Sequence, residues 1–413
     1  MPGHRMAAVD AQFYWMSAKS PNDEFLLYAF GAEPADLDEA VRQVRRRASA
    51  CADLTMRVVD DCVVRYPRWV PAPVRPEQVT HHDLADDGWD ACLSAVADLA
   101  GDQLDIRQQA WRLHVFTPVA GIPGVAGVGT VAVLQLSHAV ADGVRGAALA
   151  AWLFGRPATV PHVGTARAGF MPLLGLDAVR THRRLMRDVD AGLVTSGVGL
   201  RQPLTTNARP GRVRAIRTLV RRREQLAPPT VTVAVLAAVG TALSQFLGAA
   251  GDTLGAEVPM AKPGAPLGYN HFGNVSVGLH PQLGLAERRH RIAGELADAR
   301  RRFAHPAALA SDRAFAAVPA ALLRWGVSQF DPDARPTQVA GNTVVSSVNR
   351  GAADLSFGGA PVVLTAGYPA LSAVMGLTHG VHGIGDTVAI SVHAAESAMP
   401  DIEAYLRLLD AAL

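Results

Sequence analysis

Apolar and polar residues alternate along this chain with two different periods, and the predicted elements alternate between strands and helices. Short apolar runs or strict alternation predict strands at 25–31, 56–64, 129–136, 212–220, 253–260, 274–280, 339–348, 360–365 and 386–393. Apolar residues at helical spacing predict helices at 37–47, 89–99, 144–154, 173–194, 230–247, 287–303 and 399–413. The pattern therefore predicts a mixed α/β protein.

The predicted elements fall into two α/β blocks of similar size. Residues 156–169 carry prolines and small residues that interrupt the pattern. We therefore expect an N-terminal subdomain at 1–160, a linker or helical crossover at 161–205 and a C-terminal subdomain at 206–413. The basic helix at 173–194 is interpreted either as a linker helix with one packed face or as a helix lying on a membrane or a partner.

Composition narrows the class of protein. The 413 residues are 49% hydrophobic and 18% charged, with a net charge of +2, which allows a large core and gives no indication of nucleic-acid binding. Cys51, Cys62 and Cys92 have no metal-ligand spacing and are expected to be reduced. The N-terminus lacks an apolar signal core, and no uninterrupted apolar run would span a bilayer. We expect a cytoplasmic location, with peripheral attachment to the inner membrane as the alternative.

One segment carries candidate chemistry. The apolar strand at 129–136 leads into Ser137-His138, and Asp142-Gly143 follow before an alanine-rich helix. A neutral imidazole at a strand end can take a proton from a hydroxyl. Asp-Gly permits a sharp turn in which Asp142 hydrogen-bonds locally or pairs with a distant arginine. Taken alone, His138 is more often a structural residue than a base, so the rest of the chain must decide.

A second histidine pair is a weaker candidate. His379 and His382 are separated by Gly-Val in a segment that we interpret as a glycine-rich loop. No third ligand follows nearby, and a zinc site needs at least three protein ligands. The sequence therefore predicts no metal site.

Several short motifs occur in a characteristic order. Val9-Asp10-Ala11-Gln12-Phe13 opens the chain, Ser137 to Gly143 resembles a His-His-x-x-x-Asp-Gly motif, Gly273-Asn274 forms a Gly-Asn pair, and Ser346-Ser347-Val348 stands for Ser-Asn-Val-Pro-Gly-Pro. Their order resembles the bacterial wax ester synthase/diacylglycerol acyltransferase (WS/DGAT) family, which is part of the coenzyme A-dependent acyltransferase superfamily.

The resemblance implies a fold, a reaction and a set of site residues. The fold is two chloramphenicol acetyltransferase-like subdomains with an active-site tunnel at their interface. The reaction is attack of a hydrophobic alcohol or diacylglycerol on acyl-CoA, with His138 as general base and Asp142 holding the loop around it. Gly143, Gly273 and Asn274 are expected near the substrate, although Gly273-Asn274 can equally be a plain turn.

The same resemblance implies the other partners. The only co-substrate is acyl-CoA, without a metal or redox cofactor and without nucleic acid. Peripheral contact with a membrane or lipid droplet is the remaining expected partner.

Four departures from the family pattern oppose the acyl-CoA reaction but leave the expected fold unchanged. Ser137 replaces the first histidine, Thr232-Val233 replace an Asn-Asp pair, Ser347 replaces an asparagine, and Asn349-Arg350 replace Pro-Gly. Thr232 is still expected to cap its helix. A second hypothesis therefore remains, a catalytically weakened or inactive family member that binds an acyl lipid or a protein.

Overall fold

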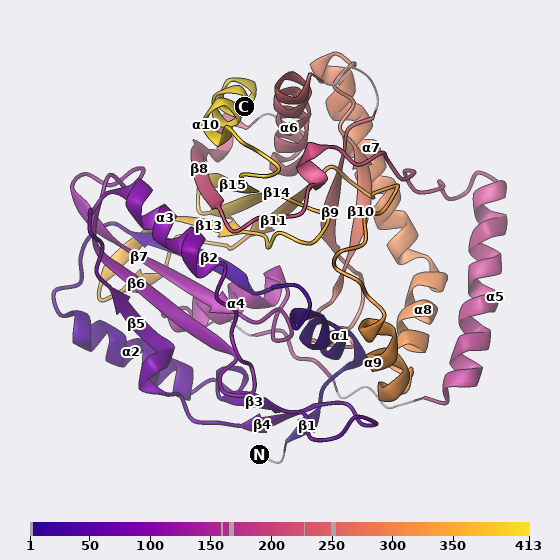
Figure 1. Cartoon of the computed structure of the whole chain (residues 1–413), viewed down its shortest axis with the longest axis horizontal. Helices are drawn as coiled ribbons and strands as arrows, with labels where there is room; N and C mark the ends of the chain where they lie inside the picture. The colour runs from indigo at the N-terminus through magenta and orange to yellow at the C-terminus, as the bar shows by residue number, and fades with distance from the viewer. Residues whose placement is uncertain (1–2, 158–159, 165–168, 227, 249–252) are drawn as a thin grey trace.

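The computed structural model describes residues 3–157, 160–164, 169–226, 228–248 and 253–413. Its core is two six-stranded sheets, one from each half of the chain, with helices around them (Figure 1). The first sheet has the order β12 (Ser356–Phe357), β13 (Ala360–Tyr368), β2 (Glu24–Phe30), β7 (Val128–Leu136), β6 (Trp111–Ala120), β5 (Val79–His82). The second has the order β10 (Phe272–Gly278), β9 (Gly255–Ala261), β11 (Thr343–Asn349), β14 (Leu377–Ile384), β15 (Thr387–Ala395), β8 (Arg214–Arg222).

The remaining elements cover these sheets. A small sheet joins β1 (His4–Arg5), β4 (Arg68–Pro71) and β3 (Met56–Val59). The helices are α1 (Ala8–Ser17), α2 (Leu37–Ser49), α3 (Trp89–Leu99), α4 (Gly143–Leu153), α5 (Met171–Asp190), α6 (Val231–Leu247), α7 (Leu285–Ala304), α8 (Pro306–Ala316), α9 (Ala320–Ser328) and α10 (Ile402–Ala412). The predicted mixed α/β fold with two sheet-and-helix subdomains is confirmed.

Strand β2 is buried on both faces, which explains its continuous apolar sequence. Leu26, Tyr28 and Phe30 pack into a core with residues of α2 and α4. Phe25 and Leu27 face the other way, into a core that α3 and the second sheet share. The first sheet is therefore a middle layer of the molecule.

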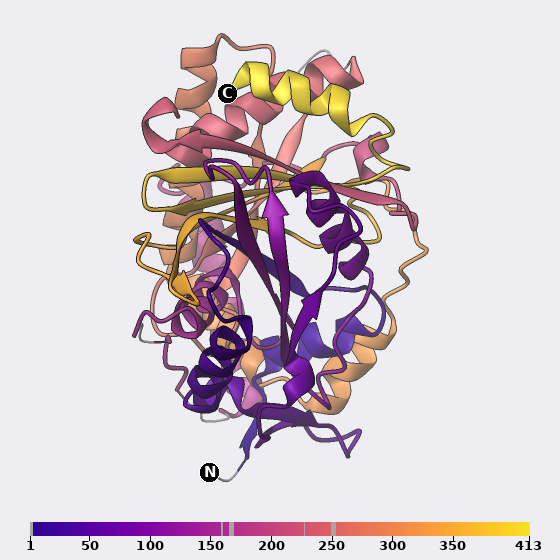
Figure 2. The ribbon, with the colours of Figure 1, turned by 90° about the vertical axis from the view of Figure 1, so that its left-hand side faces the viewer.

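The second sheet is covered on its outer side by α6, α7 and α10. Figure 2 shows α10 in yellow across that outer side, with the purple strands of the first sheet running up the view and the yellow strands of the second running across it. Helix α6 contributes Val235, Leu236 and Val239 to this core, opposite Val345 and Val381 of the sheet. Its nearly uniform apolar sequence reflects this deep burial.

One connection crosses between the halves. Strand β13 pairs antiparallel with β2, with Ala366 opposite Leu27 and Tyr368 opposite Phe25. The predicted C-terminal subdomain at 206–413 thus supplies two strands to the sheet of the N-terminal half. The single predicted boundary near residue 206 does not account for these two strands.

Strand β14 corrects the interpretation of the second histidine pair. His379 and His382 lie in a fully buried strand, not in a loop. A Cβ on Gly380 would lie 2.1 Å from the carbonyl oxygen of Gly367, so glycine is required for the close packing of β14 against β13. His379 hydrogen-bonds the hydroxyls of Thr343 (2.8 Å) and Tyr405 (2.7 Å). In the described parts of the chain no group of three or more His, Cys, Asp or Glu could hold a metal ion.

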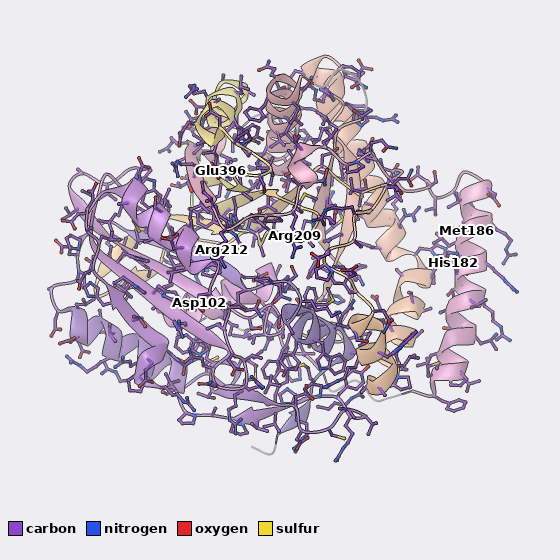
Figure 3. The ribbon with its side chains drawn as sticks, in the orientation of Figure 1. Asp102, His182, Met186, Arg209, Arg212 and Glu396 are labelled. Atoms are coloured by element: carbon purple, nitrogen blue, oxygen red, sulfur yellow. The ribbon has the colours of Figure 1, made fainter. Side chains whose placement is uncertain are left out.

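Helix α5 lies at one side of the molecule and packs against α8 (Figure 1). It buries none of its residues fully. His182 and Met186, labelled in Figure 3, are both exposed on it. Further exposed apolar residues on or beside it are Phe170, Leu173, Leu176 and Val179. Residues 165–168 of the predicted linker lie outside the described residues. No helix in the described ranges is long and apolar enough to cross a membrane.

Candidate active site at the junction of the two halves

His138 lies where α1, β7 and β10 meet. Its ring is stacked on Phe13 of α1, with centroids 4.1 Å apart and an interplanar angle of 17°. The ring of Phe272, the first residue of β10, also stacks with the imidazole, with centroids 5.7 Å apart. The His138 side chain is 18% exposed. The imidazole therefore packs against aromatic rings from both halves while solvent still reaches it.

The backbone of His138 is fixed from the second half. Its carbonyl oxygen accepts a hydrogen bond from Nδ2 of Asn270 (2.7 Å). Asn270 is held in turn by Asp10, whose Oδ1 accepts from the Asn270 backbone N–H and from Nδ2, both at 3.0 Å. Oδ2 of Asp10 accepts from the backbone N–H of Tyr269 (2.9 Å). The aspartate of the opening motif thus supports the loop that carries the candidate base.

Burial has a clear effect on Asp10, which is only 2% exposed. Desolvation raises the pKa of Asp10 to about 6, although the three hydrogen bonds from Tyr269 and Asn270 act in the opposite direction. Sequence reasoning assigned no site role to Asp10, Phe13 or Asn270, because their contacts depend on how the two halves meet.

Asp142 has two structural partners. It is the N-cap of α4, where its Oδ1 accepts from the backbone N–H of Arg145 (2.9 Å). Its Oδ2 accepts from the backbone N–H of His271 (3.0 Å) in the loop ahead of β10. Arg145 pairs instead with Asp53 at 2.7 Å. Asp142 therefore ties the His138 loop of the first half to the second half.

Gly143 begins α4 at a close approach between the halves. A Cβ on this residue would lie 2.9 Å from Cγ2 of Val348 in β11. A side chain here would therefore have to displace Val348 across the junction, and the glycine also suits the turn that the sequence predicts.

Gly273 and Asn274 lie in strand β10, at the edge of the second sheet, so their interpretation as a plain turn is wrong. They directly follow Phe272. Nδ2 of Asn274 donates to Oε2 of Glu257 on the neighbouring strand (3.3 Å). The structure thus groups His138, Asp142 and Gly143, and it places Gly273 and Asn274 along the strand leading away from them. Their role in substrate binding stays a prediction.

Glu24 is a site residue that the sequence does not reveal. Its Oε1 lies 3.7 Å from Nε2 of His138, and its side chain is 22% exposed. Strand pairing places Glu24 opposite Leu136, two residues ahead of His138. Periodicity predicts both strands but not their mutual register, so no sequence signal pairs these two residues.

Two of the departures from the family pattern contact each other. Thr232 donates a hydrogen bond from Oγ1 to Oγ of Ser347 (2.9 Å). The expectation that Thr232 caps α6 is wrong, because the N-cap is Thr230, whose Oγ1 accepts from the backbone N–H of Val233 (3.2 Å). Val233 is 2% exposed within the core of the second half.

Arg350, another departure, joins the end of β11 to the first sheet. It is 5% exposed. Its Nη1 donates to Oγ1 of Thr365 and to the carbonyl oxygen of Ala366. Arg350 is therefore a buried anchor between the two halves.

Two cavities lie near this junction. One, of about 110 Å³, is lined by His4, Met6, Asp10, Trp69, Leu267 and Tyr269 among others. The other has only about 10 Å³, and Asp23, Arg214 and His393 are among its lining residues. Neither is lined by His138, so the tunnel at the interface stays a prediction.

Solved structures define the class of this fold. WS/DGAT from Marinobacter aquaeolei VT8 matches with a TM-score of 0.64 at 17% identity, over 99% of this chain and 97% of that one. The first condensation domain of the calcium-dependent antibiotic synthetase, with a substrate analogue, matches with a TM-score of 0.61 at 17% identity, over 100% and 96%. The starter condensation domain of rhizomide synthetase, in complex with C8-CoA and Leu-SNAC, matches with a TM-score of 0.60 at 15% identity, over 99% and 93%. The chain therefore has the two-lobed acyltransferase-like fold.

The C-terminal part of the chain matches a family model. Residues 269–413 match the family model described as the WS/DGAT C-terminal domain. No curated protein sequence matches the chain significantly. The resemblance to the WS/DGAT family is therefore confirmed for residues 269–413. Over the whole chain, the solved structures show the same fold.

Proposed function

We propose that this protein is an O-acyltransferase that moves an acyl group from acyl-CoA to a hydrophobic alcohol or diacylglycerol, with His138 as general base. The observation that carries the proposal is the position of His138, a partly exposed imidazole held at the junction of the halves by Phe13 and Asn270. The C8-CoA complex of the rhizomide starter domain, a protein of the same fold, supports acyl-CoA as the donor.

The proposed reaction has two steps. Nε2 of His138 takes the hydroxyl proton while the alcohol oxygen attacks the thioester carbonyl carbon. The tetrahedral intermediate collapses when the carbon–sulfur bond breaks, and the imidazolium returns its proton to the coenzyme A thiolate. A positioned base of this kind contributes about 10²–10⁴-fold to the rate.

The oxyanion of the intermediate would face the N-terminus of α4. The cap by Asp142 already uses the N–H of Arg145. The backbone N–H groups of Gly143 and Val144 are therefore the proposed donors, and the positive end of the helix dipole adds to their effect.

The proposed acceptors are lipids, and α5 supports a contact with the surface that holds them. Its exposed side chains include Leu173, Leu176 and Val179, together with the basic residues Arg180, Arg183, Arg184 and Arg187. Such a mixture suits a membrane or lipid droplet with anionic headgroups. The acceptor is therefore best supplied in anionic vesicles.

The alternative is a binding protein that holds an acyl lipid or a protein without turnover. The hydrogen-bonded pair Thr232–Ser347 and the buried Val233 favour it, because the family's amide and carboxylate are absent where they would be expected.

A thiol-release assay across acyl-CoA lengths, with alcohols and diacylglycerol as acceptors, separates the two functions. We expect transfer by the wild type and a loss of at least about 10²-fold in His138→Ala, with an unchanged circular dichroism spectrum. His290→Ala, an exposed histidine on α7, is the matched control. Normal turnover by His138→Ala would refute the base. Saturable acyl-CoA binding without any thiol release would establish the alternative.

A further inference from the structure

We propose that Glu24 is a positioning residue for the acyl transfer described above, and that its carboxylate stabilises the imidazolium formed when His138 takes the hydroxyl proton. The inference rests on the proposed function, because Glu24 would act in the step in which His138 takes the hydroxyl proton. Its geometric basis is the 3.7 Å separation between Oε1 of Glu24 and Nε2 of His138.

The strand pairing of the first sheet holds Glu24 in this place. Glu24 is the only charged residue of β2, whose remaining residues, Phe25 to Phe30, are all apolar or aromatic. It stands at the first position of the strand, opposite Leu136. The burial of β2 on both faces fixes the register, because a shift by one residue would turn each side chain to the opposite face.

One oxygen of the Glu24 carboxylate is also enclosed. A Cβ on Gly146 of α4 would lie 3.3 Å from Oε2 of Glu24, and the methyl groups of Leu136 and Leu26 approach the same point within 3.4 Å. Oε2 is buried and has no hydrogen-bond partner in the described chain. An acceptor left in such a place is costly for stability, and a catalytic role is one explanation for such a group.

The surrounding charges make the pair mutually dependent. The groups that face Glu24 are His138 from the loop after β7, Asp142 from the start of α4, Arg350 from the end of β11, and its own neighbour Asp23. Burial raises the pKa of Glu24, and the positive charge of His138 opposes this rise. The carboxylate is therefore favoured most when His138 is protonated, which is the state that the proposed reaction creates.

Arg350 does not take over this role. Its Nη1 is directed at the carbonyl oxygens of Leu27 and Ala366 and at the hydroxyl of Thr365. The charge of Arg350 also favours the Glu24 carboxylate, but it is the same before and during turnover. The imidazole of His138 is the group that gains a positive charge during turnover.

The test compares Glu24→Gln, which keeps the size and removes the charge, with Glu24→Asp, which keeps the charge on a shorter side chain. The ring signals of histidine-labelled protein are followed by NMR against pH, and His138→Ala identifies the signal of His138. We expect Glu24→Gln to move the titration midpoint of His138 down by about one pH unit or more. Glu24→Asp should move it less.

The kinetic readout is the acid limb of the kcat/KM profile, which should move down by the same amount in Glu24→Gln, with kcat lowered by about tenfold. The control is Glu295→Gln, which removes the charge from another buried Glu–His pair, with His280 (2.7 Å), and should leave the His138 titration unchanged. An unmoved His138 titration in a folded Glu24→Gln variant would overturn the inference. Because this titration needs no turnover, it separates failure of the inference from failure of the proposed reaction.

Discussion

Removing the carboxylate of Asp142 should destabilise the protein through two separate contacts. In Asp142→Ala, α4 loses the N-cap bond to Arg145, which contributes about 1 kcal/mol. The backbone N–H of His271 loses its acceptor at a half-buried position, at a cost of about 1–3 kcal/mol. We therefore expect the free energy of unfolding to fall by about 2–4 kcal/mol.

The measurement is urea unfolding followed by tryptophan fluorescence. Asp401→Ala is the matched control, because Asp401 caps α10 through the N–H of Ala404 (2.8 Å) and is exposed. It should lose only the cap, about 1 kcal/mol. The loss of stability in Asp142→Asn should lie between those of Asp142→Ala and Asp401→Ala, because the amide keeps one oxygen to accept from Arg145.

Two results would refute this reasoning. If Asp142→Ala loses no more stability than Asp401→Ala, the bond to His271 contributes nothing across the junction. If Asp142→Ala keeps its full stability and loses all transfer, Asp142 acts directly in the chemistry and is not a structural residue.

Two further predictions concern buried acidic groups. Restoring the family pair with Thr232→Asn and Val233→Asp places a carboxyl in an apolar core, where Val233 is 2% exposed. Urea unfolding should therefore show that the free energy of unfolding falls by about 3–5 kcal/mol. Full stability together with raised transfer would show that an acid is still accommodated there. Desolvation raises the pKa of Asp10 and of Asp23 from 3.8 to about 6. Because the folded protein keeps these protons to a higher pH than the unfolded chain, stability should fall as the pH rises from about 4 to about 6 and change little above that. Unfolding midpoints of the wild type and Asp23→Asn across this range test the sign, and equal slopes would contradict it.

The sequence predicts local features of this molecule well. The helix 89–99 is found with its predicted bounds, and the order strand, histidine loop, Asp-Gly, helix is found around His138. Both features depend on residues close together in the sequence, where burial produces a hydrophobic period and capping residues mark the helix ends.

Features that depend on packing between distant segments are not visible in the same way. Glu24 approaches His138 only through the register of β2 and β7, which no periodicity encodes. The glycines of β14 resemble those of a loop, although Gly380 permits contact between two sheets. The sequence cannot distinguish Thr230 from Thr232 as the cap of α6, because both offer the same hydroxyl, and only the backbone geometry selects Thr230.

The crossing of β13 into the first sheet constrains how the protein can be made. During synthesis, β2 and β7 emerge from the ribosome long before residues 360–368, so β2 has an unpaired edge while most of the chain is translated. A nascent N-terminal half cannot complete its sheet alone, although N-terminal units usually fold first. The growing chain therefore exposes an apolar edge that is open to intermolecular pairing, and its final closure must await nearly the last strands.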